Sequence, residues 1–447
     1  MTNARPREIA SKIVRRLQTA GFSAFWVGGC VRDFLLGREP QDYDIATDAR
    51  PEQIEKLFKK TIAVGRKFGV MIVVEGKQPF QVATFRAEAD YRDGRRPEKV
   101  VFSNAQADAQ RRDFTVNGLF YDPIAQKLHD WVGGEKDLRA RIIRTIGAPE
   151  ERFAEDHLRL LRAVRFAAQL EFEIEPETFA AVKKLAPKIE LISAERIRDE
   201  LIKLFSPPHA GRGFVLLRDS RLLPGVLPEL IATILCQQSP DYHPEGTVFE
   251  HIRLMLEKLP LNSPPSLPWA AILHDIAKPA TADRDATSGA IHFYGHEKVG
   301  AAMAERILRR LRFPKKQIEE MVTCVRQHMQ FKDVKQMRKA TLRRLLMRET
   351  FPLELELHRL DCLGSHGNLE NYEFLLAQRE ELKKKPAIRP PLLTGKNLIK
   401  LGMKPGPAMG ELLEEIREKQ LADELKTPRQ AKAWAKRQLS AHGRRTN

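Results

Sequence analysis

The feature that most constrains the fold is a change of hydrophobic periodicity near residue 150. Before it, short segments rich in β-branched and aromatic residues, such as VMIVVEG and FQVATFR, are separated by turn residues, which is typical of strands. From Arg152 onward, segments such as FAEDHLRLLRAVRFAAQL place apolar residues at helical spacing, which is typical of amphipathic helices. The sequence therefore predicts an α+β fold, with a mixed sheet and helices up to about residue 150 and an all-helical remainder.

The first third of the chain is expected to alternate helices with strands. Helices are predicted over residues 7–20, 31–37 and 51–60, and Gly37 closes the second of them because glycine commonly ends a helix. Strands are predicted over FSAFWVGG, DYDIAT, VMIVVEG, FQVATFR and KVVFS. The first strand therefore ends in a glycine turn that leads directly into a helix.

The chain is expected to contain several domains, since its 447 residues exceed the size that one hydrophobic core usually supports. Pro-rich segments at residues 206–211, 260–268 and 385–395 are candidate hinges or subdomain limits. We expect four parts: residues 1–150, 151–210, 211–385 and 386–447.

The charge of the chain indicates a polyanionic partner. Lys and Arg number 76 against 59 acidic residues, which gives a formal net charge of +17. Any one basic run, such as RILRRLRFPKK, is equally typical of a solvated helix face. The excess is distributed over many segments, and this favours a surface that binds the backbone of a nucleic acid through counterion release.

Composition also excludes several classes of protein. No apolar run approaches the roughly 20 residues of a membrane span, and the N-terminal segment lacks the apolar stretch of a secretory signal. We therefore expect a cytoplasmic protein that makes no membrane contact. The four cysteines are far apart and form no CxxC pair, so the sequence predicts neither a disulfide framework nor a thiolate zinc site.

The segment VGGCVRDFLLGREPQDYDIAT contains the first candidate site. If DYDIAT is a strand, Asp42 and Asp44 share one face and Tyr43 lies on the other. Two carboxylates on one face are suited to Mg²⁺ and to phosphoryl or nucleotidyl transfer. Gly28 and Gly29 lack Cβ atoms where the strand meets the helix, so main-chain N–H groups can approach a triphosphate. A DxD alone is often incidental, and the glycine turn before it favours the catalytic interpretation.

These residues resemble the head domain of the class II nucleotidyltransferases of the DNA polymerase beta superfamily, which comprise CCA-adding enzymes and bacterial poly(A) polymerases. The resemblance rests on GGxxRDxxLGxxxxDxDxAT, and it continues through DGRRP, RRDFTVNGLFYDP, EDHLRLLRAVRFAAQL and SAERIRDEL. It covers residues 20–205 in the order that the family shows. The fold it implies is a nucleotidyltransferase head followed by a helical neck, body and basic, RNA-binding tail.

The resemblance implies roles for particular residues. Asp42 and Asp44 would be the catalytic, metal-binding carboxylates. Gln81 stands where many relatives have an acidic residue, and we leave it out of the metal set. A flexible loop that helps reorganise the site would contain Asp93, Gly94, Arg95 and Arg96. The residues near the nucleotide would be Gly28, Gly29, Arg32, Arg111, Arg112, Asp113 and Asn117.

A helix expected to begin near Phe153 is the candidate base-reading element. On it, Glu155, Asp156, Arg159 and Arg162 form a charged strip, which is equally typical of a surface Glu155–Arg159 ion pair. The family resemblance implies that Asp156 and Arg159 recognise the base. Cytosine and adenine each present an amino donor beside an unprotonated ring nitrogen, so a carboxylate and a guanidinium together select CTP and ATP.

A second candidate site lies in the helical remainder, where eight of the twelve histidines fall between His243 and His366. Imidazoles with carboxylates are suited to one or two divalent metals. The order H…HD…H…H…D resembles the HD superfamily of metal-dependent phosphohydrolases, and a helical body that retains these residues without activity stays an alternative. The candidate ligands of this unidentified divalent metal are His251, His274, Asp275, His296, His328 and Asp361.

The sequence thus indicates a CCA tRNA nucleotidyltransferase that uses CTP, ATP and tRNA, with Mg²⁺ at the first site and possible phosphohydrolase chemistry at the second. A poly(A) polymerase or a partial CC- or A-adding enzyme stays open, because the head motifs hardly separate them. Two further alternatives are an HD phosphohydrolase with an RNA-binding head and a non-catalytic RNA-binding protein. The oligomeric state does not follow from the sequence.

Overall fold

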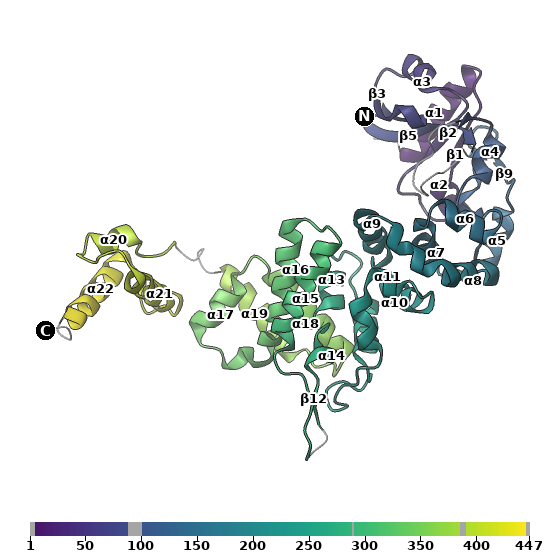
Figure 1. The fold of residues 1–447 in the computed structure, drawn as a ribbon. Coiled ribbons are helices and arrows are strands. Elements are labelled where there is room, and N and C mark those ends of the chain that lie inside the picture. The colour runs from purple at the N-terminus through teal and green to yellow at the C-terminus, as the bar shows by residue number, and fades with distance from the viewer. Residues whose placement is uncertain (1–4, 88–100, 288–289, 385–389, 444–447) are drawn as a thin grey trace. The chain divides into compact units, whose positions relative to one another are not determined.

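The computed structural model describes residues 5–87, 101–287, 290–384 and 390–443. It groups into two compact units, the first made of Met1–Ile231 with Arg310–Arg312 and the second of Ala232–Arg309 with Phe313–Asn447. The predicted α+β class is confirmed, because the sheet lies in the first unit and the chain after it is almost entirely helical (Figure 1). None of the helices in the described parts of the chain combines the length and apolar character that a membrane crossing requires.

A seven-stranded mixed sheet forms the centre of the N-terminal part. Its order is β3-β4-β5-β2-β1-β8-β9, in which β2 and β5 are parallel and the other neighbours are antiparallel. The sheet consists of β1 (Ala24–Val27), β2 (Ile45–Thr47), β3 (Thr61–Gly65), β4 (Val70–Glu75), β5 (Gln78–Thr84), β8 (Phe120–Asp122) and β9 (Lys127–His129). The strands predicted at FSAFWVGG, VMIVVEG and FQVATFR are therefore present.

The predicted strand DYDIAT is shorter than expected, since β2 begins at Ile45. The reason is the length of its partner, because β1 ends at Val27 and the chain then turns into α2. Asp42 and Asp44 consequently precede the strand. The predicted alternation of faces persists, with Tyr43 buried against Trp26 at a ring-centroid distance of 4.9 Å.

The helices of the N-terminal part largely follow the sequence pattern. The helices predicted over 7–20, 31–37 and 51–60 are α1 (Pro6–Thr19), α2 (Gly29–Leu35) and α3 (Pro51–Leu57). The remaining elements are η1 (Arg66–Phe68), β6 (Arg86–Ala87), β7 (Val101–Phe102), α4 (Ala105–Gln110), η2 (Thr115–Asn117), α5 (Gly134–Ala140) and β10 (Ile142–Ile143). The strand predicted at KVVFS is described only over β7.

The helical end of the first unit is organised around α7, which packs against α9 and α10. Its apolar face is buried over most of its length, as the helical spacing predicts. These elements are α6 (Pro149–Glu155), α7 (Leu158–Leu170), β11 (Glu173–Ile174), α8 (Pro176–Leu185), η3 (Ala186–Leu191), α9 (Ala194–Leu204), α10 (Ala210–Asp219), α11 (Leu223–Val226) and η4 (Pro228–Ile234).

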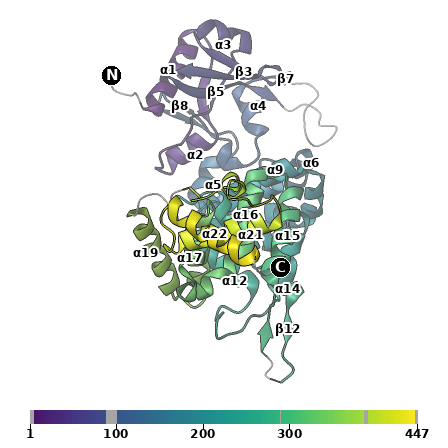
Figure 2. The same cartoon turned by 90° about the vertical axis from the view of Figure 1, so that its left-hand side faces the viewer.

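The second unit is centred on α13 (Ser266–Leu273), every residue of which is buried. The segment SLPWAAIL is apolar on nearly all sides, and such a helix is stable only inside a core. It packs against α12, α16 and α18, and its last turn leads into the HD dipeptide. The two-stranded hairpin of β12 and β13 projects from the helices of this unit (Figure 2).

The second unit continues to the end of the chain. Its elements besides α13 are α12 (Val248–Glu257), α14 (Lys278–Thr281), β12 (Asp283–Arg284), β13 (Ile291–His292), α15 (His296–Arg310), α16 (Lys315–Gln327), η5 (His328–Gln336), α17 (Lys339–Leu346), α18 (Phe351–Gly364), α19 (Glu370–Lys384), α20 (Gly395–Ile399), α21 (Pro407–Leu421) and α22 (Pro428–Gly443). The last three helices share a small core around Leu398 and Ile416.

Two of the Pro-rich segments lie inside the units. Residues 206–211 separate α9 from α10 in the first unit, and residues 260–268 separate α12 from α13 in the second. Part of the third segment lies outside the described residues. The four-part division expected from the sequence stays a prediction.

Candidate functional site

The first site is built where β1 turns into α2. Gly28 has φ +73°, and a Cβ placed on it would lie 2.9 Å from Nη1 of Arg112. The positive φ therefore favours glycine, and a side chain at this position would displace the guanidinium of Arg112. The strand, glycine turn and helix predicted from the sequence are confirmed.

Asp42 and Asp44 lie at this turn as an interacting pair. Asp42 is exposed and Asp44 is half-buried. Burial and then the charge of Asp42 raise the pKa of Asp44 to about 6, while the charge of Arg112 opposes this shift. Two carboxylates that repel each other in a partly buried position form a site that a divalent cation would stabilise. The donor set of carboxylate oxygens fits a hard cation such as Mg²⁺.

Gln81 lies on β5, the strand next to β2. The pairing of Ile45 with Val82 places Gln81 one residue before Val82, level with Asp44. The side chain that replaces the acidic residue of many relatives is thus level with the carboxylate pair.

Arg111 and Arg112 follow α4 and share one acidic partner, Asp108. Nη2 of Arg111 lies 2.5 Å from Oδ1 of Asp108, and Nη2 of Arg112 lies 3.1 Å from Oδ2. Although burial alone would raise the pKa of Asp108, the two arginines lower it. Asp108 was missed by the sequence reasoning, and its signal is the spacing of three and four residues before the arginine pair.

Asp113 and Asn117 belong to a continuous polar network. Nη1 of Arg32 donates to Oδ1 of Asn117 at 2.7 Å, and Nδ2 of Asn117 donates to Oδ1 of Asp113 at 3.3 Å. Nε of Arg162 donates to Oδ2 of Asp113 at 2.7 Å. Burial disfavours the charge of Asp113, yet the adjacent Arg162 lowers its pKa. The structure thus brings together four predicted residues: Arg32 of α2, Asn117 of η2, Arg162 of α7 and Asp113, which lies between α4 and η2.

The helix expected to begin near Phe153 is interrupted, and this part of the prediction is wrong. α6 ends at Glu155, and Asp156 is extended with φ −151° and ψ 103°. The carboxylate of Asp156 accepts a hydrogen bond from the N–H of Leu158, the first residue of α7, at 3.0 Å. The four residues therefore do not form one strip along a continuous helix.

Asp156 and Arg159 have separate partners in this structure. Asp156 pairs with Nη2 of Arg196 at 2.6 Å, whereas Arg159 pairs with Glu155. Arg159 also donates from Nη2 to the main-chain oxygen of Arg111 at 3.4 Å. The Glu155–Arg159 pair considered from the sequence is present, and its arginine contacts the segment that holds the arginine pair. The predicted loop residues Asp93, Gly94, Arg95 and Arg96 lie outside the described residues.

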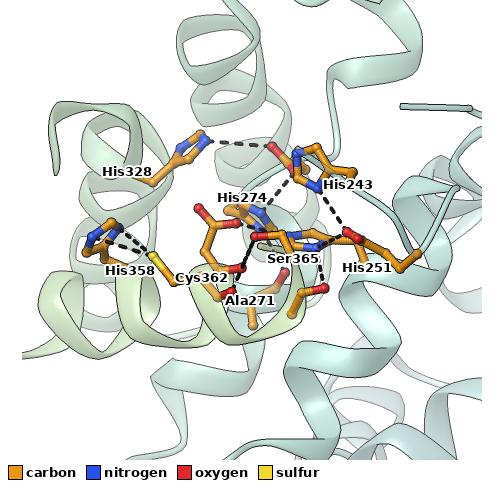
Figure 3. A network of polar contacts seen from close by, with 12 residues as sticks. His243, His251, Ala271, His274, His328, His358, Cys362 and Ser365 are labelled. Atoms are coloured by element: carbon orange, nitrogen blue, oxygen red, sulfur yellow. Dashed lines mark hydrogen bonds and ion pairs between the residues drawn. The ribbon is translucent and has the colours of Figure 1, made fainter. Parts of the chain in front are cut away.

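The second site is assembled entirely within the second unit. Its six predicted residues come from α12, the end of α13, the start of α15, the end of α16 and α18, and Figure 3 shows part of the network that they form. Nε2 of His251 lies 3.1 Å from Oδ1 of Asp361, and Nε2 of His274 lies 3.0 Å from Oδ2 of Asp275. The ligand-atom clusters are His251, His274 and Asp361 on one side and Asp275, His296 and His328 on the other.

Three of the histidines use Nδ1 for a main-chain hydrogen bond. His274, His296 and His328 place Nδ1 at 2.8, 2.7 and 2.7 Å from the carbonyl oxygens three residues earlier. A proton on Nδ1 leaves the lone pair of Nε2 directed into the cluster, which is the arrangement of a metal-binding imidazole. The residues present thus fit one or two divalent cations.

Charge within the second site is concentrated on the aspartates. Burial alone would raise the pKa of Asp275, but the surrounding His274 and Lys278 hold it well below the usual range. Burial likewise opposes ionisation of Asp361, and its hydrogen bond with His251 lowers the pKa. Two ionised carboxylates surrounded by imidazoles are the donor set expected of a mixed nitrogen and oxygen metal site.

The sequence reasoning missed three polar residues beside this cluster, namely the buried Lys278 and the partly buried His243 and Glu245. Their signals were available in the segments HPEGTVFEH and HDIAK. The first places a histidine and a carboxylate shortly before His251, and the second places a lysine one helical turn after Asp275.

Family models match the regions that contain the two candidate sites. Residues 24–144 match the model of the poly A polymerase head domain, residues 171–234 match "Probable RNA and SrmB- binding site of polymerase A", and residues 243–363 match the HD domain. The nucleotidyltransferase and HD families are metal-dependent, in keeping with the candidate metal-binding groups described above.

Curated relatives match the chain over part of its length. The CCA-adding enzyme of Lactobacillus helveticus is 44% identical over 214 residues, which are 48% of this chain and 53% of that enzyme. The CCA-adding enzyme of Staphylococcus aureus is 46% identical over 208 residues, 46% of this chain and 52% of that enzyme. The matches thus span about half the length of these relatives.

A solved structure matches the chain throughout. The Bacillus stearothermophilus CCA-adding enzyme in complex with CTP has a TM-score of 0.73 and 26% identity, covering 99% of this chain and 100% of that one. The fold is also that of the Thermotoga maritima CCA-adding enzyme complexed with tRNA, with a TM-score of 0.61 and 19% identity over 98% of this chain and 97% of that one.

Proposed function

We propose that this chain, which belongs to the family of CCA-adding enzymes and bacterial poly(A) polymerases, adds C, C and A to the 3′ end of tRNA without a nucleic-acid template. The observation that carries the proposal is the Asp42–Asp44 pair beside the Gly28 turn and Arg112. This geometry is combined with a full-length likeness to an enzyme whose structure contains CTP. The net charge of +17 supports tRNA as the polyanionic partner.

In the proposed reaction, the 3′-hydroxyl of tRNA attacks the α-phosphorus of CTP or ATP. A phosphorus–oxygen bond forms to that hydroxyl, and the bond to the departing pyrophosphate breaks. Asp42 and Asp44 would hold Mg²⁺, which when bound supplies charge stabilisation on the phosphates and favours ionisation of the hydroxyl. Arg111 and Arg112, held by Asp108, would bind the negative charge of the triphosphate.

We assign base selection to Asp156 and Arg159, in keeping with the family resemblance. In this structure they pair with Arg196 and Glu155, so recognition of a base requires each to exchange its partner. A carboxylate that accepts from the amino group and a guanidinium that donates to the ring nitrogen would admit cytosine and adenine. With guanine or uracil, the ring N–H would face the N–H donors of the guanidinium. Leaving these donors without acceptors is costly in a partly buried site.

The experiment that tests this function supplies a tRNA transcript ending at the discriminator base with each nucleoside triphosphate alone, and then with CTP and ATP together. CTP alone should add two residues, and the pair should add three and then stop. An open-ended adenosine ladder would instead indicate a poly(A) polymerase. Addition of A only to a tRNA already ending in CC would indicate a partial A-adding enzyme. When GTP or UTP is supplied alone, no residue should be added to the tRNA.

A second function, hydrolysis of a phosphomonoester or a 2′,3′-cyclic phosphate, is proposed for the site in the second unit. The observation that favours it is that the six predicted ligands form two clusters of three, which the 3.0 Å contact between His274 and Asp275 joins. His274→Ala combined with Asp275→Ala should abolish divalent-metal-dependent hydrolysis of 2′,3′-cyclic AMP and spare CCA addition. Loss of both activities together would contradict an independent hydrolytic site.

The cytoplasmic location expected from the sequence stays a proposal.

A further inference from the structure

Three polar side chains beside the metal centre of the second unit are too buried to be ordinary surface groups. The exposed fractions of the side chains of Glu245, Lys278 and His243 are 6%, 8% and 17%. Burying a charged side chain is costly unless it is paired and hydrogen-bonded. The partners of these residues therefore indicate why they are retained.

Glu245 faces the nitrogen of His251 that points away from the cluster. Its Oε1 lies 2.7 Å from Nδ1 of His251, while Nε2 of the same ring lies 3.1 Å from Asp361. A carboxylate at Nδ1 favours a proton on that nitrogen and leaves the lone pair on Nε2. The main-chain oxygen of Gly364 lies farther from the same Nδ1, at 3.4 Å, so Glu245 is the nearer acceptor that sets the ring orientation of His251.

Lys278 holds the carboxylate of Asp275 in position, as Glu245 holds the ring of His251. Its Nζ lies 2.7 Å from Oδ2 of Asp275 and donates to Oε1 of Gln238 at 2.6 Å. The third contact is with Nε2 of His243 at 3.4 Å. An ammonium group has three N–H donors, and each has an acceptor here. Because all three are used, the position of Lys278 is fixed, and one oxygen of Asp275 is fixed with it.

His243 joins the two halves of this arrangement. Its Nδ1 lies 2.9 Å from Oε1 of Glu245, and its Nε2 faces Lys278. We propose that Glu245 and Lys278, linked through His243, are positioning residues that orient His251 and Asp275 for divalent metal binding. The inference rests on the metal centre proposed above. Such outer partners typically change metal affinity by about 10- to 100-fold when they are removed.

A further cation bound by His243, Glu245 and His251 is the competing interpretation, since their ligand atoms are also close together and Oε2 of Glu245 is buried without a hydrogen-bond partner among the described residues. One observation disfavours it. The imidazole of His251 would have to give Nδ1 to that cation while Nε2 serves the main cluster.

The test is Mn²⁺ binding by the full-length chain, followed by electron paramagnetic resonance. Asp42→Ala and Asp44→Ala are present throughout, so that the first site does not contribute. Glu245→Gln and Lys278→Met should each weaken Mn²⁺ binding about 10- to 100-fold. Glu245→Ala should weaken it more than Glu245→Gln, because the amide oxygen of glutamine still accepts a hydrogen bond. The matched control is Glu257→Gln, which removes a carboxylate of α12 that pairs with Arg253 and should leave the affinity unchanged.

A double variant tests the link itself. If His243 and Glu245 act through one chain of contacts, His243→Ala combined with Glu245→Gln should weaken binding by less than the product of the separate factors. Unchanged Mn²⁺ affinity in Glu245→Gln would overturn the inference. Loss of one Mn²⁺ per chain with unchanged affinity for the rest would overturn it too, since Glu245 would then be a ligand of a separate cation. Absence of Mn²⁺ binding before any of these substitutions would overturn the metal centre itself.

Discussion

Replacing Asp108 with asparagine tests how the nucleotide-binding arginines are held. The side chain of Asp108 is 2% exposed, and those of Arg111 and Arg112 are 19% and 20% exposed. Removing one partner of a buried ion pair costs about 3–5 kcal/mol. Asparagine keeps one oxygen acceptor and the arginines are partly solvated, so we expect unfolding free energy to fall by about 2–3 kcal/mol.

The same substitution should weaken use of the nucleotide. Asparagine at position 108 carries no charge, so neither arginine is held in one orientation. The hydrogen bond that Asp108 accepts from the main-chain N–H of Arg86 at 3.2 Å is also weakened. We expect kcat/KM for CTP and ATP to fall about 10- to 100-fold, which corresponds to about 1.4–2.8 kcal/mol of transition-state stabilisation. The measurement is single-nucleotide incorporation into tRNA, combined with urea unfolding of the same preparations.

Glu175→Gln is the matched control for Asp108→Asn. Glu175 is a buried carboxylate that caps α8 through the N–H of Thr178 at 2.7 Å and pairs with Arg144 at 3.3 Å. Its replacement should lower stability while leaving kcat/KM for both nucleotides unchanged. Equal nucleotide kinetics in Asp108→Asn and the unsubstituted chain would refute the positioning role.

The pH dependence of the Asp108 effect has a defined sign. Since the folded-state pKa of Asp108 is lowered, its contribution to stability is present above the unfolded-state pKa of about 3.9 and is lost as the pH falls through the folded-state value. The difference in unfolding free energy between the two chains should therefore be constant near neutral pH and shrink below about pH 4.

Three further predictions concern the first unit and the cysteines. Asp42→Ala or Asp44→Ala should abolish nucleotide incorporation and leave tRNA affinity in a filter-binding assay nearly unchanged; retained incorporation would exclude the proposed role. Gly28→Ala should lower the free energy of unfolding by about 1–3 kcal/mol through backbone strain, and it should raise the KM for CTP by displacing Arg112. Gly37 also has a positive φ, +71°, but no atom lies within 4 Å of an added Cβ. Gly37→Ala should therefore affect stability alone. Burial raises the pKa of all four cysteines, but only Cys236 is half-buried while the other three are buried, so Cys236 should react first with a thiol reagent in the folded chain; mass spectrometry of the labelled peptides would reveal any other order.

Sequence patterns predicted those parts of the sites that depend on local geometry. The glycine turn and the burial of Tyr43 follow from strand and helix periodicity. Both are present in the structure although β2 begins only at Ile45. The candidate HD ligands could be predicted as a set from their order along periodic helices: His274, His296 and His328 lie at helix ends, and His251 and Asp361 lie within helices. In the same way, the apolar character of SLPWAAIL predicts a buried helix, which places His274 inside the core.

Other parts were not predictable because they depend on contacts distant in sequence. The break at Asp156 is stabilised by Arg196, which is 40 residues away, and helical periodicity alone continues through it. Glu245 and Lys278 are linked through His243, and each contacts a different residue of the cluster, so their roles depend on the tertiary fold. Asp108 is the exception, because its partners are three and four residues away and its spacing was available in the sequence.

The position of α13 has a consequence for how the second unit unfolds. A cation held by residues of α12, α13, α15, α16 and α18 would bind only while all five helices are together. Its free energy of binding would then add to the stability of this unit, by about 2.7 kcal/mol when the free cation is at 100 times its dissociation constant. Resistance of the unit to proteolysis would therefore rise with the free concentration of that cation.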